Sequence, residues 1–197
     1  STALHLAASQ GHVETCRSIL RCPHFTALDA VDTKGNTALH VAAYHGLVEV
    51  CTILLSSPNF TAIAARSDDG STALILAAMQ GHAPVFELMV QHPRLTALNV
   101  ATKHGNTALH YASANGMDVS ALLAHPKFTA HDAEDAFGDT ALTLAASNEH
   151  TATCTALLAC PRFTAREHAN KDGDTALSVV AMLGNVELCA LLLPGSS

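Results

Sequence analysis

The stretch TALHVAAYHG, residues 37–46, decides the fold of this chain because close copies of it recur along the whole sequence. Its Thr-Ala-Leu opening begins at Thr2, Thr37, Thr72, Thr107, Thr140 and Thr175, with spacings of 35, 35, 35, 33 and 35 residues. A fixed period of this length predicts a solenoid, in which each repeat buries its apolar face only against its neighbours. This architecture favours a binding function over a catalytic one.

A single repeat is expected to fold as two helices followed by a loop. The Thr37 hydroxyl can cap a first helix over residues 38–45, and Gly46 can end that helix in the left-handed conformation. A second helix is predicted over residues 48–55, and the stretch at 60–65 is expected to be extended before the next turn. The apolar positions of the first helix are Leu39, Val41, Ala42 and Ala43.

The repeated pattern resembles a known family. The six copies read TALHLAASQGH, TALHVAAYHGL, TALILAAMQGH, TALHYASANGM, TALTLAASNEH and TALSVVAMLGN, and a Leu-Leu pair closes most second helices. This pattern resembles the ankyrin repeat over essentially the whole chain. Two departures are systematic: Ala replaces the family's usual Pro after the Thr, and a Pro-x-Phe-Thr-Ala loop makes the repeat two residues longer than the usual form.

The resemblance implies an all-α fold, an ankyrin-type α-solenoid of helix–turn–helix repeats with β-turn loops. We expect one domain over residues 1–197, excerpted from a longer protein, with repeats at about 2–36, 37–71, 72–106, 107–139, 140–174 and 175–197. The resemblance also implies that the histidines of the Thr-Ala-Leu-His motif bond to nearby loop groups and tie adjacent repeats together. These histidines are His5, His40 and His110.

Local departures distinguish the C-terminal half of the chain. The second helix of repeat four is two residues short, and Glu149 stands where the other repeats have Gly. His131 and Arg166 replace the Leu or Ile found in the earlier loops. Each departure weakens packing between neighbours, so we expect the last two repeats to stack less tightly and to unfold first.

The charge and the apolar pattern exclude two classes of partner. The chain has 10 Lys and Arg residues against 17 Asp and Glu residues, a net charge of −7, and no basic cluster. Nucleic acid needs a concentrated basic surface, so we expect no nucleic-acid partner. No apolar run approaches the ~18–20 residues that cross a bilayer, so we expect no membrane insertion. We expect a cytoplasmic monomer.

Cysteine and histidine occupy fixed repeat positions, which predicts packing roles for them. Four of the six cysteines lie 14 residues after their repeat's Thr, and the other two lie 20 after it. We therefore expect reduced structural thiols and no disulfide. No zinc, nucleophile-elbow or phosphate-loop motif is present, so we predict no metal, no cofactor and no enzymatic activity.

The resemblance implies that a partner protein binds on the concave face, which is built from the turn tips and the exposed side of the first helices. Residues at those positions vary between repeats, and Tyr44, Met79 and Phe137 are large apolar side chains where solvent exposure is expected. The predicted partner-binding residues are Lys34, Tyr44, His45, Asp68, Asp69, Met79, Gln80, Lys103, His104 and Phe137. The alternative is a structural spacer or scaffold segment of a larger multidomain protein whose activity lies outside this chain.

Overall fold

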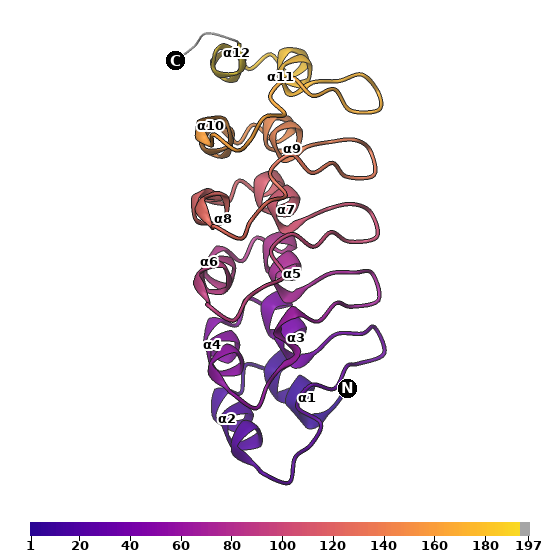
Figure 1. Cartoon of the computed structure of the whole chain (residues 1–197), viewed down its shortest axis with the longest axis vertical. Coiled ribbons are helices and arrows are strands. Elements are labelled where there is room, and N and C mark those ends of the chain that lie inside the picture. Colours follow the sequence, from indigo (N-terminus) through magenta and orange to yellow (C-terminus); the bar gives the residue numbers. More distant parts are fainter. Residues whose placement is uncertain (194–197) are drawn as a thin grey trace. The chain divides into compact units, whose positions relative to one another are not determined.

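The computed structural model describes residues 1–193, and its contacts divide the chain into two compact units, Ser1–Val100 and Ala101–Ser197. Each unit consists of three helix pairs joined by loops (Figure 1). Within residues 1–193 no β-strand forms, and only isolated bridges join Ala101 to Thr107 and Ala169 to Thr175. The prediction of an all-α fold of helix–turn–helix repeats is confirmed.

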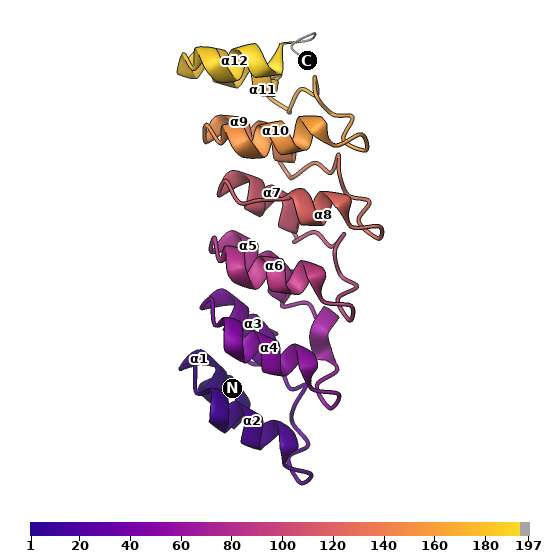
Figure 2. The ribbon, with the colours of Figure 1, turned by 90° about the vertical axis from the view of Figure 1, so that its left-hand side faces the viewer.

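The first unit contains α1 (Ala3–Ser9), α2 (Val13–Arg21), α3 (Ala38–Tyr44), α4 (Val48–Ser56), the 3-10 helix η1 (Ala62–Ala64), α5 (Ala73–Met79) and α6 (Ala83–Gln91). The first helices of the pairs, α1, α3 and α5, contact one another in sequence, as do the second helices, α2, α4 and α6. In this unit the turns project from the layer of first helices (Figure 1), and the second helices face the viewer in Figure 2.

The second unit contains α7 (Ala108–Ala114), α8 (Ser120–Ala124), α9 (Ala141–Ser147), α10 (Thr151–Ala159), α11 (Ala176–Leu183) and α12 (Val186–Leu192). Here α9 packs between α7 and α11, and α10 contacts α8. The predicted shortening of repeat four is present: α8 has 5 residues, whereas the second helices of repeats one, two, three and five have 9.

Both ends of the first helices form as the sequence predicts. The threonine hydroxyl accepts a hydrogen bond from the main-chain N–H three residues later at Thr37, Thr72, Thr107, Thr140 and Thr175. Gly46 has φ 69°, the left-handed conformation that ends α3. Glu149 has φ 57° at the same position of repeat five, which a side chain with a Cβ tolerates poorly.

Small side chains fill the space between the layers. The Ala42-Ala43 and Ala77-Ala78 pairs are fully buried, which lets successive first helices approach closely. Cys16 and Cys51 are buried in the layer of second helices, as their fixed repeat position predicts. Phe60 is also fully buried, so the aromatic residue of the loop is part of the core.

The histidines of the Thr-Ala-Leu-His motif connect neighbouring repeats. His40 Nδ1 accepts from the N–H of Thr37 (3.2 Å), and His40 Nε2 lies 3.1 Å from the main-chain oxygen of Ser71, the residue directly before the Thr72 cap of the next repeat. The same bond joins His5 to Asn36 (2.8 Å) and His110 to Asp139 (3.1 Å). The role that the family resemblance implies for these side chains is confirmed.

The Pro-x-Phe-Thr-Ala loop corrects one prediction, because residues 60–65 are not wholly extended: Ala62–Ala64 forms a 3-10 turn. The physical reason is a carboxylate from the preceding repeat. Asp29 accepts hydrogen bonds from the N–H groups of Thr61 (2.8 Å) and Ala62 (3.0 Å), which caps the start of the turn. Asp132 caps the loop of repeat five in the same way.

The variable residue after the Pro of this loop binds the C-terminal end of the second helix in the preceding repeat. Arg94 donates to the carbonyl oxygens of Leu55 (2.8 Å), Ser57 (2.7 Å) and Phe60 (2.6 Å), at the C-terminus of α4 and just beyond it. Arg162 donates in the same way to Leu123 (2.9 Å), at the end of α8. The longer loop therefore supplies N–H donors to the carbonyl oxygens at a helix end, which otherwise lack hydrogen-bond partners.

Two residues that were expected to loosen the C-terminal half make good contacts. His131 is buried and meets the Phe128 ring edge-on, with centroids 4.8 Å apart. Arg166 donates to the carbonyl oxygens of Leu191 (3.0 Å) and Leu193 (3.1 Å), at the end of α12. Each side chain therefore replaces the apolar contact of the earlier loops with a ring contact or a helix cap, and the lower stability of the last two repeats stays a prediction.

Candidate functional site

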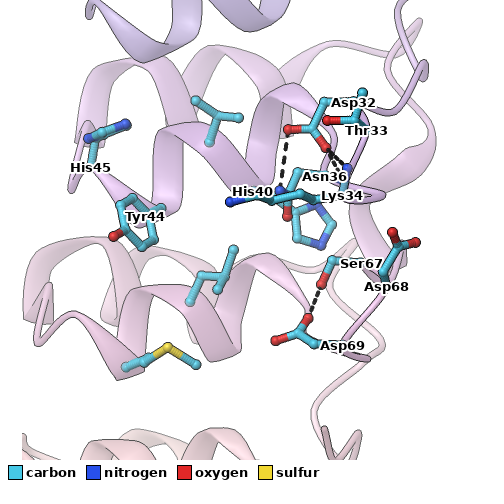
Figure 3. A pocket seen from close by; sticks show the side chains of 13 residues that line it. Asp32, Thr33, Lys34, Asn36, His40, Tyr44, His45, Ser67, Asp68 and Asp69 are labelled. Atoms are coloured by element: carbon cyan, nitrogen blue, oxygen red, sulfur yellow. Dashed lines mark hydrogen bonds between the residues drawn. The ribbon is translucent and has the colours of Figure 1, made fainter. Parts of the chain in front are cut away.

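A groove of about 650 Å³ lies on the first unit, between the turns that precede repeats two and three and the first helices of those repeats (Figure 3). Its walls come from the turns at residues 32–36 and 67–69, and its floor comes from α3 and α5. The lining residues are Asp32, Thr33, Lys34, Asn36, His40, Val41, Tyr44, His45, Ser67, Asp68, Asp69, Leu76 and Met79.

The floor of the groove is apolar. Val41 and Tyr44 lie three residues apart on α3, and Leu76 and Met79 have the same spacing on α5, so each pair occupies one helix face. Tyr44 is 46 % exposed, and the other three are half-buried. The His45 ring meets the Tyr44 ring edge-on at 5.2 Å. These side chains present a contiguous apolar surface to solvent.

The turn end of the groove is polar and held by hydrogen bonds. Asp32 Oδ1 accepts from the N–H groups of Lys34 (2.8 Å) and Asn36 (2.9 Å), which closes the turn. The two turns are joined because the N–H of Asp68 donates to the main-chain oxygen of Lys34 (2.9 Å). The turn end is therefore a preformed wall.

The turn carboxylates stay ionised near neutral pH. Burial alone would raise the pKa of Asp32, but hydrogen bonds from Asn36 and Lys34 outweigh burial and lower the pKa. The pKa of Asp69 is lowered for the same reason, since the bonds from Ser67 and Ser71 outweigh its burial. These two side chains carry negative charge beside the apolar floor.

His40, a buried residue of the groove lining, is neutral near neutral pH, and both of its ring nitrogens form hydrogen bonds. Burial lowers its pKa, and the bonds to Thr37 and Ser71 place an acceptor on Nδ1 and a proton on Nε2. Because both ring nitrogens are bonded, His40 holds the turn that ends at Ser71, directly before repeat three. The groove therefore offers surfaces for recognition: charged turns, an apolar floor and a braced wall.

Six of the ten predicted partner-binding residues line this groove: Lys34, Tyr44, His45, Asp68, Asp69 and Met79. Gln80 is exposed at the end of α5 but lies outside the lining. The remaining three belong to the second unit, where Lys103 and His104 are exposed in one turn and Phe137 is 68 % exposed in the next. The groove thus brings together six of the seven predicted residues of the first unit.

Sequence reasoning missed two floor residues. Val41 was placed among the packing positions of the first helix, but it is half-buried and lines the groove, as does Leu76. The available signal was their three-residue spacing from Tyr44 and Met79, which puts them on the same helix face. A second, smaller groove of about 270 Å³ lies between α8 and α10 and is lined mainly by Leu, Ala and Pro side chains.

Within residues 1–193 no three His, Cys, Asp or Glu side chains are grouped so that they could hold a metal ion. Over the same residues, every helix is too short or too polar to cross a membrane. All six cysteines are unpaired.

Solved structures with similar folds are ankyrin repeat proteins and a protein complex. The ankyrin repeat protein EF0377 has 25 % identity and a TM-score of 0.83, with 96 % of each chain covered. A second similar chain comes from the complex of the predatory endopeptidase Bd0816 from Bdellovibrio bacteriovorus with immunity protein Bd3460. It has 26 % identity and a TM-score of 0.77, covering 98 % of this chain and 97 % of that one. An ankyrin repeat domain from Acinetobacter baumannii, at 24 % identity, has a TM-score of 0.79 over 96 % of this chain and 95 % of that one.

A comparison with curated proteins gives no match. The family model described as ankyrin repeats, in three copies, matches residues 1–64, 58–130 and 119–197. These matches together span the whole sequence, and they agree with the helix pairs, the threonine caps and the histidine ties. This chain belongs to the ankyrin repeat family.

Proposed function

We propose that this chain is a protein-interaction module that binds a partner protein on the face formed by its turns and first helices, with the groove of the first unit as a principal contact. The observation that carries the proposal is the exposed apolar floor, in which Tyr44 and Met79 lie beside charged turns. Apolar centres with polar rims are typical of protein-binding surfaces. Phe137 on the second unit is a further anchor.

The family and one similar structure support this function. Ankyrin repeats are generally protein-interaction modules, and their fold is typically a non-enzymatic scaffold. One similar chain comes from a complex between an endopeptidase and an immunity protein. The net charge of −7 and the lack of a basic cluster favour a protein partner over nucleic acid. A cytoplasmic monomer without catalytic activity is part of the proposal.

The alternative is a spacer within a larger protein. A spacer gains nothing from exposing Tyr44 and Phe137, since exposed aromatic side chains promote unwanted association. The exposed Met182 and Val186 of the last repeat carry less weight, because within residues 1–193 no later repeat packs against α11 and α12.

Comparison of anchor variants tests the proposal once a partner has been captured by cross-linking. Tyr44→Ala and Met79→Ala are each expected to weaken binding by about 1–3 kcal/mol. Their melting temperatures should stay close to that of the parent chain, because surface changes cost little stability. Met182→Ala is the matched control, because Met182 occupies the same repeat position on α11 and lies outside the groove.

Two outcomes would count against this function. If Tyr44→Ala, Met79→Ala and Phe137→Ala all leave the affinity unchanged, the partner does not use this face. If these variants instead melt at much lower temperature, the three side chains serve packing and the spacer interpretation gains support.

A further inference from the structure

We propose that the groove of the first unit binds an extended segment of the partner protein that carries a Lys or Arg at the turn end and a bulky apolar side chain at the helix end. This inference rests on the proposed function and adds the chemistry of the ligand. It follows from three features of the groove: the charge at one end, the apolar floor at the other, and the distance between them.

The turn end favours a cation. Three carboxylates, Asp32, Asp68 and Asp69, stand against one ammonium group, that of Lys34. Asp32 and Asp69 stay ionised while they hold the turns. Among residues 1–193 the exposed Asp68 carboxylate forms no hydrogen bond or ion pair, so it is free to meet a ligand. A basic side chain gains charge-assisted bonds there.

The helix end favours an apolar side chain. Tyr44 and Met79 lie on adjacent first helices, and Val41 and Leu76 continue the surface toward the turns. The end of α3 is braced, because His82 Nε2 lies 3.0 Å from the main-chain oxygen of Tyr44. A braced apolar site binds without first paying for its own ordering.

The length of α3 sets a lower limit on the spacing between the two ligand side chains, because the turn carboxylates lie beyond the start of the helix. The helix runs from Ala38 to Tyr44, 7 residues. At about 1.5 Å per residue it spans roughly 10 Å. An extended chain advances about 3.3 Å per residue, so its basic and apolar side chains should be at least about three residues apart.

Labelled Gly/Ser peptides test this inference on the full chain by fluorescence anisotropy. The reference peptide carries one Arg and one Phe at the tightest-binding spacing of a series that starts at about three positions. Matched peptides replace Arg with Glu, replace Phe with Ala, or place the two next to each other, which is too close to span α3. We expect the reference peptide to bind most tightly, with roughly fivefold or greater losses for each change. Added salt should reduce the difference in affinity between the Arg and Glu peptides, because it screens the charges.

Variants of the protein locate the binding. Asp68→Asn should weaken the reference peptide several-fold, and Lys34→Gln should strengthen it, because the first removes attraction and the second removes repulsion. Met79→Ala should weaken it through the apolar end. The matched controls are Asp172→Asn, an exposed turn carboxylate of the second unit, and Met182→Ala; both should leave the affinity unchanged.

The outcomes separate this inference from the proposed function. Tighter binding of the Glu peptide, or of the peptide with adjacent Arg and Phe, overturns the inference. If that binding is lost in Met79→Ala, the groove still binds protein and the proposed function stands. The absence of measurable binding for every peptide also overturns the inference. If a peptide binds but none of the groove variants changes its affinity, the groove is not the binding site, and both proposals fail for it.

Discussion

His82 Nε2 lies 3.0 Å from the main-chain oxygen of Tyr44, so a histidine of repeat three is bonded to the end of the first helix of repeat two. Its ring also covers Gly46: a Cβ built on that glycine would lie 2.6 Å from His82 Nδ1. His150 has the same relationship to Ala114 (3.0 Å) and to Gly116 (2.6 Å) in the second unit. The glycine that ends the helix therefore also makes room for the histidine that braces it.

Gly46→Ala should destabilise the protein more than Gly11→Ala does. Both glycines have positive φ, so each substitution costs about 1 kcal/mol for backbone strain. At Gly46 the new methyl group would also collide with His82, whereas at Gly11 it would only touch Leu47 at 3.4 Å. Urea unfolding measures the difference. Adding His82→Ala to Gly46→Ala should remove the extra loss, and equal costs for the two glycines would contradict the packing described here.

Ser113→Ala should stabilise the protein by about 1 kcal/mol. Ser113 is fully buried, and its hydroxyl has no hydrogen-bond partner in the part of the chain that the structure describes. An unsatisfied buried hydroxyl carries a desolvation cost of about 1–3 kcal/mol. The reciprocal change at the same repeat position, Ala78→Ser, should destabilise by a similar amount. Thermal melting of both variants checks the pair, and a lower midpoint for Ser113→Ala would show that the hydroxyl is satisfied.

Acidification should reduce stability through His40 and His110. Burial lowers the pKa of both side chains in the folded protein, so the unfolded chain takes up protons more readily. Their contribution is therefore complete above the unfolded pKa of about 6.5 and is lost as the pH falls toward the folded pKa.

Chemical denaturation between mildly alkaline and mildly acidic pH measures this loss. His40→Thr, which copies the residue at the same position in repeat five, should reduce the pH dependence. His24→Thr removes an exposed histidine and is the control, with the parental slope expected. If the pH dependence of the unfolding free energy is unchanged in His40→Thr, this histidine does not contribute to it.

The cysteines should differ strongly in reactivity. Burial raises the pKa of Cys51 to about 12 and that of Cys154 to about 11, so neither forms the reactive thiolate in the folded state. Cys22 is exposed and should be alkylated first. Mass spectrometry of the chain labelled at mildly alkaline pH, with and without denaturant, gives the order. Rapid labelling of folded Cys51 would mean that the layer of second helices opens readily.

Glu149→Gly should stabilise repeat five. Glu149 adopts φ 57°, and glycine relieves a strain of about 1 kcal/mol at such a position. The Glu149 carboxylate accepts a hydrogen bond from Asn185 (2.8 Å), which the substitution removes, so Glu149→Ala is the necessary control. Glycine should be more stable than alanine by unfolding measurements. Faster hydrogen exchange in α9 and α10 than in the helices of repeats one and two would support early unfolding of the last two repeats.

The groove shows where prediction from sequence succeeds and where it stops. Tyr44 and Met79 were identifiable because large apolar side chains stand at positions expected to face solvent. Val41 and Leu76 were not, since an apolar residue inside a helix is more often buried, and only the neighbouring repeat decides how far it is covered. Whether a residue belongs to the core or to a surface depends on that neighbour.

The repeat, the helix caps and the alanine pairs of the core can be predicted from the sequence, because they depend on local spacing: Thr37 can cap only the turn that follows it, and Gly46 must lie where φ is positive. The bonds of Arg94 to the end of α4, of Arg166 to the end of α12 and of His82 to Tyr44 become visible only in the folded stack. Each of these bonds joins groups that are about 25 to 39 residues apart in the chain. Such partners meet only when helix pairs stack, so no local pattern specifies them.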